Sequence, residues 1–238
     1  MGKNILKIVG IFILGIAGGI FADQILWPYL IERPLFYKYK LENVPAFVNE
    51  TKEITIQENT ALENAVEKVA KIVVGIKTRT ANGKVFEGSG LIITSDGLVV
   101  TLAELVPQGS NFTFFVDGKA VSFQILKRDL KLNLALIKID ENNLGTSGFA
   151  DLEKIKLGER VFLVGVIFEN NVPQKIANEG IIKSFDPSII ETNIFEEKTI
   201  LGSPLFDIEG NALGLNKIDS EGKVITIPIS KIKSFCGL

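Results

Sequence analysis

The chain has 238 residues, which is enough for an apolar N-terminal segment and one domain of about 170–180 residues. Its formal net charge is −2, from 26 Lys and Arg against 28 Asp and Glu, which excludes the strongly basic surface of nucleic-acid-binding proteins; we expect no nucleic-acid partner. The chain contains no histidine and a single cysteine, Cys236, so an internal disulfide is excluded and we expect no metal site and no cofactor. We expect Cys236 to pack as a small apolar side chain.

The first element in chain order is an unbroken run of apolar residues and glycines at 8–22. If Lys7 reaches back to the interface, the stretch 5–22 attains the lower limit of about 17–25 residues for a transmembrane helix. An aromatic-rich stretch at 25–30 follows and suits the membrane interface. We therefore predict a membrane anchor over residues 1–31, which makes the membrane a partner of the chain.

Two other interpretations of this segment stay open. A cleaved signal peptide is the first, but it would need a small-x-small cleavage site, and the bulky Ile20 stands two positions before Ala22. A buried core helix is the second, and the separation of the segment from the rest of the chain argues against it.

Residues 32–59 have mixed charge and two prolines and are predicted to form a juxtamembrane linker. The sequence Thr-Ala-Leu-Glu at 60–63 is a capping box, in which Thr60 and Glu63 would satisfy the first N–H groups of a helix. Apolar residues at 62, 65, 66 and 69 predict that this helix continues to Ala70.

After residue 70 nearly every segment has the composition of a short strand, rich in β-branched and aromatic residues and bounded by turn signals such as Asn-Gly and Asp-Gly. We predict an all-β fold of two six-stranded antiparallel barrels, one at about 70–143 and one at about 158–230, within a domain covering 60–238. Periodicity alone does not distinguish barrels from a sandwich. The predicted strands are Ile72–Lys77, Val85–Ile93, Leu98–Thr101, Phe112–Val116, Ala120–Leu126, Leu134–Ile139, Val161–Ile167, Gln174–Phe185, Ile189–Asn193, Leu205–Asp207, Ala212–Ile218 and Val224–Ile229.

Three segments carry the information about function. The first reads Gly-Ser-Gly-Leu-Ile-Ile at 88–93, passes an Asp-Gly turn at 96–97 and continues as Thr-Leu-Ala-Glu-Leu-Val at 101–106. The second reads Leu-Asn-Leu-Ala-Leu-Ile-Lys-Ile at 132–139. The third, at 191–205, ends in Gly-Ser-Pro-Leu.

In this order the segments resemble motifs of the trypsin-like (chymotrypsin-fold) serine proteases, and specifically of their HtrA-like branch. Further similar motifs at 155–165 and 223–228 extend the resemblance over roughly residues 70–230. The resemblance implies a trypsin-like double β-barrel. Because the chain ends just after the last motif, we expect no PDZ domain.

The same resemblance places Glu104, Asn133 and Leu201 where the family has its catalytic His, Asp and Ser. A Ser nucleophile needs a neighbouring base, and the base needs an orienting carboxylate. With all three replaced, we predict a degenerate triad without catalytic residues, in a pseudoprotease that is not an enzyme. We expect Leu201 to fill the former cleft, Glu104 to be solvated or hydrogen-bonded to the backbone, and Asn133 to keep hydrogen bonds to the turn around residue 104.

The oxyanion hole is also expected to be lost or closed, because Thr199 stands at the place of its first glycine and resists positive φ. The function we predict is binding of an extended peptide or another protein, since trypsin-like folds dock peptides along a strand beside the nucleophile. The candidate residues are Thr199, Leu201, Gly202, Ser203, Lys223, Val224, Ile225, Thr226 and Ile227.

Two alternatives remain. A structural or assembly protein would use apolar surfaces such as Phe112, Phe114 and Phe115, or the linker aromatics Phe36, Tyr37 and Tyr39. An active serine-type endopeptidase would need a rearranged site, with Ser203 or Thr199 as nucleophile.

The resemblance also bears on localisation, because the family usually works outside the cytoplasm. Lys3 and Lys7 precede the apolar run, and this positive charge favours a cytoplasmic N-terminus. We predict a single-pass membrane protein with its β domain on the extracytoplasmic side.

Overall fold

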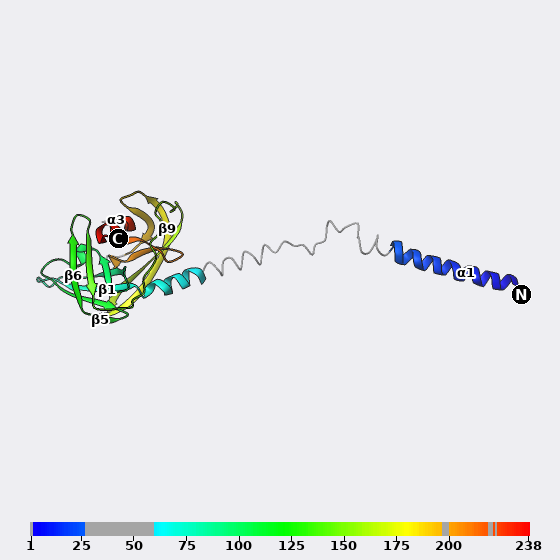
Figure 1. Cartoon of the computed structure of the whole chain (residues 1–238), viewed down its shortest axis with the longest axis horizontal. Helices are drawn as coiled ribbons and strands as arrows, with labels where there is room; N and C mark the ends of the chain where they lie inside the picture. Colours follow the sequence, from blue (N-terminus) through cyan, green and yellow to red (C-terminus); the bar gives the residue numbers. More distant parts are fainter. Residues whose placement is uncertain (1, 27–59, 197–199, 219–220, 222) are drawn as a thin grey trace. The chain divides into compact units, whose positions relative to one another are not determined.

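The computed structural model describes residues 2–26, 60–196, 200–218, 221 and 223–238. The chain separates into two compact units, residues 1–55 and 56–238, and each is described by itself (Figure 1). In the first unit α1 spans Gly2–Phe21, within a helical segment of 25 residues that ends at Leu26 and contains an 18-residue stretch with a mean hydropathy of 2.4. By length and composition this helix is able to cross a membrane. Residues 27–31 of the predicted anchor and the whole predicted linker, 32–59, lie outside the described residues.

The second unit begins with the helix at 60–70, as the capping box predicts. Seven antiparallel strands follow and form one sheet in the order β5-β4-β1-β2-β3-β7-β6, with a short 3-10 helix, η3 (Ala103–Leu105), after β3. The strands are β1 (Val73–Arg79), β2 (Val85–Ile92), β3 (Leu98–Thr101), β4 (Asn111–Val116), β5 (Lys119–Val121), β6 (Phe123–Asp129) and β7 (Leu134–Ile139).

The remaining strands close into a six-stranded antiparallel barrel in the order β10-β13-β12-β11-β8-β9. The helix α3 (Ile229–Cys236) ends the fold, and Gly237 caps it with a positive φ of 79°. The strands are β8 (Arg160–Glu169), β9 (Val172–Phe185), β10 (Ile190–Phe195), β11 (Pro204–Asp207), β12 (Ala212–Ile218) and β13 (Lys223–Pro228).

The predicted all-β, trypsin-like fold is confirmed, and closure of the second barrel excludes the sandwich. The first half differs in detail, because the predicted strand at 120–126 divides into β5 and β6 at Ser122. The carbonyl of Ser122 accepts a hydrogen bond from the N–H of Asp140, 2.9 Å away, which continues the β6–β7 pairing, whereas β5 pairs with β4. The chain therefore changes its pairing partner at Ser122. The first half is therefore a sheet of seven strands, while the second is the predicted six-stranded barrel.

A single hydrophobic cluster joins the two halves. It contains core residues of the first sheet, such as Ile76 and Leu136, together with Val166 of β8 and Phe206 of β11. A second, smaller cluster fills the closed barrel. The larger cluster therefore holds the first sheet against the barrel by hydrophobic burial.

Buried polar contacts also join the halves at Ser89 of β2. Its hydroxyl accepts a hydrogen bond from the N–H of Val166 at 2.8 Å, and its N–H donates to the carbonyl of Leu201 at 2.7 Å. Its carbonyl accepts from the hydroxyl of Thr101 at 2.6 Å. Since Ser89 is fully buried, these groups satisfy their hydrogen bonds with one another and not with water.

We predict that Ser89→Ala lowers the free energy of unfolding by about 1–3 kcal/mol, because the Val166 N–H would be left buried without an acceptor. Urea denaturation of the purified chain measures the effect. Ser122→Ala is the matched control, since Ser122 is exposed in the same sheet and its loss should change little. Equal effects of the two substitutions would show that the Ser89 hydroxyl is not a structural link.

Candidate functional site

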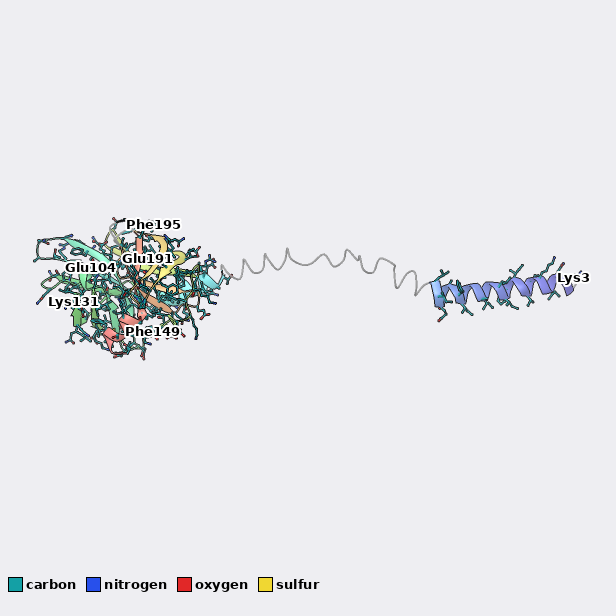
Figure 2. The ribbon with its side chains drawn as sticks, turned by 90° about the horizontal axis from the view of Figure 1, so that it is seen from above. Lys3, Glu104, Lys131, Phe149, Glu191 and Phe195 are labelled. Carbon is teal, nitrogen blue, oxygen red and sulfur yellow. The ribbon has the colours of Figure 1, made fainter. Side chains whose placement is uncertain are left out.

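Glu104 and Asn133 form a reciprocal pair at the end of β3. The side-chain oxygen of Asn133 accepts from the Glu104 N–H at 3.0 Å, and the Asn133 amide donates to the Glu104 carboxylate at 2.6 Å. The carbonyl of Asn133 also accepts from the N–H of Ala103. Asn133 has a φ of +54°, which asparagine tolerates better than most residues. Asn133 therefore holds the η3 turn, as its isosteric relation to aspartate suggested, while the Glu104 side chain stays exposed (Figure 2).

The turn at 200–203 carries the third triad position. Leu201 is partly buried and packs against the cluster shared by the two halves, as expected of an apolar side chain in a former cleft. Gly202 has a φ of +74°, and a Cβ placed on it would lie only 2.3 Å from the Ser89 carbonyl oxygen and 3.0 Å from Cδ1 of Leu105. The turn is thus pressed against β2 and against the residue that follows Glu104. The three predicted triad positions are brought into one region.

Two main-chain donors of this turn are engaged inside the protein. The N–H of Gly202 donates to the carbonyl of Asn216 at 2.8 Å, and the N–H of Ser203 donates to the carbonyl of Ile200 at 3.0 Å. These two donors do not face an open oxyanion site. Thr199, on which the expectation of a lost hole depended, lies outside the described residues.

A fully buried polar network lies under the turn. The hydroxyl of Ser203 accepts from the amide of Asn216 at 3.2 Å, and the other side-chain atom of Asn216 accepts from the hydroxyl of Thr226 at 2.6 Å. All three residues have no exposed surface. The Ser203 hydroxyl therefore points into the protein and anchors the turn to β12 and β13.

The proposed docking strand at 223–227 needs correction. Residues Lys223, Val224, Ile225, Thr226 and Ile227 belong to β13, which pairs with β12 on one side and with β10 on the other. The pairing with β10 is interrupted only by a bulge between Glu191 and Phe195. A strand inside a closed barrel has no free edge, so β13 cannot receive an added peptide strand along its length.

The end of β12 offers an edge instead. The ladder between β11 and β12 starts at the pair Pro204–Leu215, so the residues after Leu215 extend past β11. Asn216 turns its N–H to Ser203 and its carbonyl to Gly202. Because main-chain groups alternate sides along a strand, the N–H and carbonyl of Ile218 point to this same side, away from β13.

Three residues of this site were missed by sequence reasoning, namely Asn216, Ser89 and Thr101. Each is a fully buried polar residue inside a strand of mostly apolar residues. That pattern was available as a signal, because a polar side chain in a buried strand needs a specific partner. Some partners lie on the neighbouring strand, such as Thr226 for Asn216 and Thr101 for Ser89, while Val166, the partner of the Ser89 hydroxyl, is distant in sequence.

The other candidates have structural placements. Phe114 is fully buried and Phe112 is partly buried, with its ring 6.2 Å from that of Phe123, so both contribute to the core rather than to an assembly surface. The linker aromatics Phe36, Tyr37 and Tyr39 lie outside the described residues. Within the described ranges, no group of three or more His, Cys, Asp or Glu could hold a metal ion. Burial raises the pKa of the Cys236 thiol to about 11, partly opposed by Lys127, so this cysteine stays protonated.

Comparisons with known proteins agree with this architecture. A family model described as a trypsin-like peptidase domain matches residues 88–215, which is more than half of the chain. A probable periplasmic serine endoprotease DegP-like from Halomonas elongata is 29% identical over 135 residues, covering 54% of this chain and 28% of that protein. Human serine protease HTRA4 is 28% identical over 191 residues, covering 71% of this chain and 40% of that protein.

A solved structure of an HtrA-type protease, AlgW with tripeptide, superposes with a TM-score of 0.65 and 21% identity. It covers 74% of this chain and 62% of that one, and it supports the fold. The chain spans well under half of the length of these curated relatives.

The prediction that the chain is not an enzyme is contradicted by these comparisons. The relatives are named serine proteases and the structural neighbour is an HtrA-type protease, so the family relationship points to protease activity. The chain has no histidine, and Leu201 has no hydroxyl. Hydrolysis by this chain would therefore use groups other than a Ser-His-Asp relay at positions 201, 104 and 133. The residues matched by the family model, together with the fold, place the chain in the trypsin-like peptidase domain family.

Proposed function

We propose that the chain is a membrane-anchored, trypsin-fold protein that binds polypeptides in an extended conformation at the end of β12, beside the 200–203 turn. The observation that supports this most directly is the extension of β12 past β11. On that side Asn216 is occupied by the turn, and Ile218 is the next residue with outward main-chain groups. An extended peptide could continue the sheet there by main-chain hydrogen bonds.

The previously identified residues act around this edge rather than as a docking strand. Leu201 would offer an apolar contact to the peptide, because its side chain is only partly buried. Gly202 and Ser203 hold the Asn216 main chain, and Thr226 holds its side chain. The rest of β13 supports β12 from the far side. The related AlgW structure was solved with a tripeptide, which adds weight to peptide binding as the shared property.

Backbone recognition predicts a two-residue period. We expect an unstructured peptide to bind the ¹⁵N-labelled chain and to shift the amide resonances of 201–203 and 216–218. N-methylation of every second peptide residue can be placed on the odd-numbered or on the even-numbered residues. One of these two sets should lower the affinity by about tenfold or more and the other should lower it little, because only alternate N–H groups face β12. The set with little effect is the internal control. Loss of affinity without alternation, or shifts confined to other strands, would count against this edge.

Hydrolysis of the bound peptide is the second candidate function, and the names of the relatives favour it. We expect the purified chain to release fragments from an unfolded protein such as casein, detected by mass spectrometry. Cleavage should persist in Ser203→Ala, because that hydroxyl is buried and bound to Asn216. Absence of fragments would leave binding as the function of the domain. Loss of cleavage in a Ser203→Ala variant that still binds the peptide would make Ser203 the nucleophile, whereas loss of both would reflect the anchoring of the turn by its hydroxyl.

Membrane attachment by residues 2–26 gives a separate prediction, supported by the apolar helix and by the periplasmic relatives. Expressed in a bacterium, the full chain should sediment with membranes and resist carbonate extraction. Protease added to spheroplasts should digest the β domain, since we propose that it lies outside the cytoplasm. Recovery of a shortened soluble form would instead identify a cleaved signal sequence, and a protected domain would reverse the orientation.

A further inference from the structure

A second concave site lies where the first sheet meets the barrel. It is a pocket of about 490 Å³ formed by β1, the end of β4 with its turn, and β8 and β9. This volume falls within the range of about 300–1,000 Å³ typical of small-molecule sites. None of its lining residues belongs to the η3 turn, the 200–203 turn or the end of β12. The pocket is therefore distinct from the proposed peptide edge.

Lys175 supplies a cationic group to this pocket. The residue as a whole is exposed on β9, but its ammonium end is drawn inward and donates to the carbonyl of Val73 on β1. An ammonium has three donors, so this one contact leaves capacity for a ligand. Burial lowers the pKa of Lys175 to about 8, and the nearby Asp117 carboxylate opposes that shift only in part. A carboxylate partner would therefore be favourable for this ammonium.

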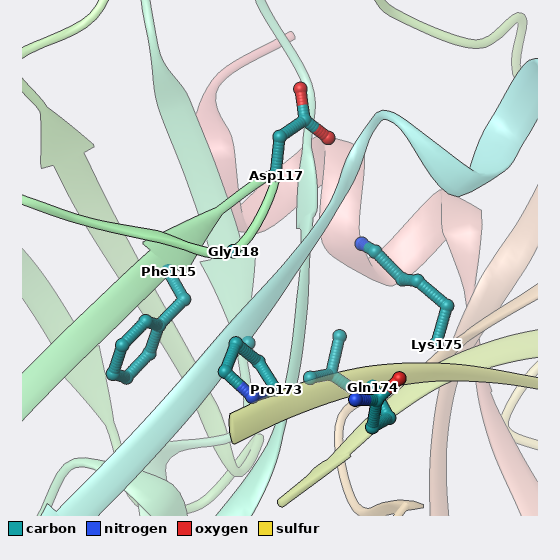
Figure 3. A pocket seen from close by; sticks show the side chains of 8 residues that line it. Phe115, Asp117, Gly118, Pro173, Gln174 and Lys175 are labelled. Atoms are coloured by element: carbon teal, nitrogen blue, oxygen red, sulfur yellow. The ribbon is translucent and has the colours of Figure 1, made fainter. Parts of the chain in front are cut away.

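Asp117 supplies an anionic group across the opening. It stands with Gly118 in the two-residue turn between β4 and β5, and both have positive φ, 46° and 78°. Figure 3 shows its carboxylate and the Lys175 ammonium in the upper part of the pocket, above Phe115 and Pro173. Within the part of the chain that the structure describes, no ion pair joins Asp117 to Lys175. The two opposite charges are thus near each other without being closed into a salt bridge.

The rest of the lining includes the polar Gln174 and an apolar wall of Phe115, Pro173 and Val166 that is held in place. The Phe115 ring lies 5.3 Å from the Phe168 ring in an edge-on arrangement. The Lys77 ammonium sits over the Phe168 ring at 5.2 Å and is itself fixed by the side chain of Asn171 at 2.8 Å. Val166 at the base is fully buried. An apolar ligand group would therefore meet a preformed surface rather than ordering one.

We infer that this pocket binds a free amino acid with an apolar side chain. Its carboxylate contacts the Lys175 ammonium, its ammonium contacts the Asp117 carboxylate, and its side chain packs on Phe115 and Pro173. A zwitterion is the smallest ligand that bridges two such unpaired charges while burying apolar surface. A peptide terminus offers only one of the two charges.

The first test changes the ligand and leaves the protein intact. The full chain in detergent is titrated by calorimetry with L-phenylalanine, with N-acetyl-L-phenylalanine and with L-phenylalaninamide. The second ligand mimics a peptide C-terminus and the third a peptide N-terminus. We expect L-phenylalanine to bind at least about tenfold more tightly than either, because each analogue loses one charge-assisted contact.

The second test changes the protein at each charge. Lys175→Met and Asp117→Asn should each weaken L-phenylalanine binding by about tenfold or more. Asparagine keeps the positive φ at 117, so the turn should survive. Lys183→Met, exposed on the same strand, and the exposed Asp140→Asn are matched controls and should bind like the unmodified chain.

The outcomes separate cleanly. Failure of L-phenylalanine to bind at millimolar concentration would overturn the inference. Equal binding of N-acetyl-L-phenylalanine would mean recognition of a peptide C-terminus instead and would also overturn it. Binding that is insensitive to both Lys175→Met and Asp117→Asn would place the ligand elsewhere. These comparisons remain decisive if one variant fails to fold, because the ligand series uses the unmodified protein.

Discussion

The buried Ser89 in β2 is the contact on which the arrangement of the candidate site depends. Through its three polar groups it links β8, the 200–203 turn and Thr101. The 200–203 turn holds the main chain of Asn216 by hydrogen bonds. Ser89, in the first half of the domain, therefore helps to position the end of β12 in the second half. Hydrogen bonds of this kind are individually modest, but leaving any of them unmade in the interior is costly.

Most of the fold follows from local signals in the chain. Alternating apolar residues and Asn-Gly or Asp-Gly turns place nearly every strand, because period and turn chemistry are local properties. The division at Ser122 does not follow, since the chain changes its pairing partner there from β4 to β7, which is a long-range property. The predicted six-stranded barrel implies that β13 pairs on both sides, but the identity of β10 as its second partner is a long-range property.

The structural role of a site residue was predictable where that residue has the same shape as the one it replaces. Asn133 keeps the contacts that an aspartate could make with the turn at Glu104, so its role could be inferred from isostery. The buried network of Ser203, Asn216 and Thr226 could not, because it depends on the register between β11, β12 and β13, such as the pairing of Asn216 with Thr226. The prediction of no enzyme relied on the three triad positions and the oxyanion turn, whereas the comparisons cover a longer stretch, residues 88–215 for the family model, and point to a protease family.

The core shared by the two halves has a thermodynamic consequence. Because one hydrophobic cluster runs from the first sheet to β8, β11 and α3, neither half can melt while the other stays intact. The domain should behave as a single cooperative unit. A molecule bound at the end of β12, or in the pocket beside Lys175, would therefore raise the melting temperature of both halves together. A ligand bound at one site would therefore raise the stability of the whole domain, even if it does not change the structure.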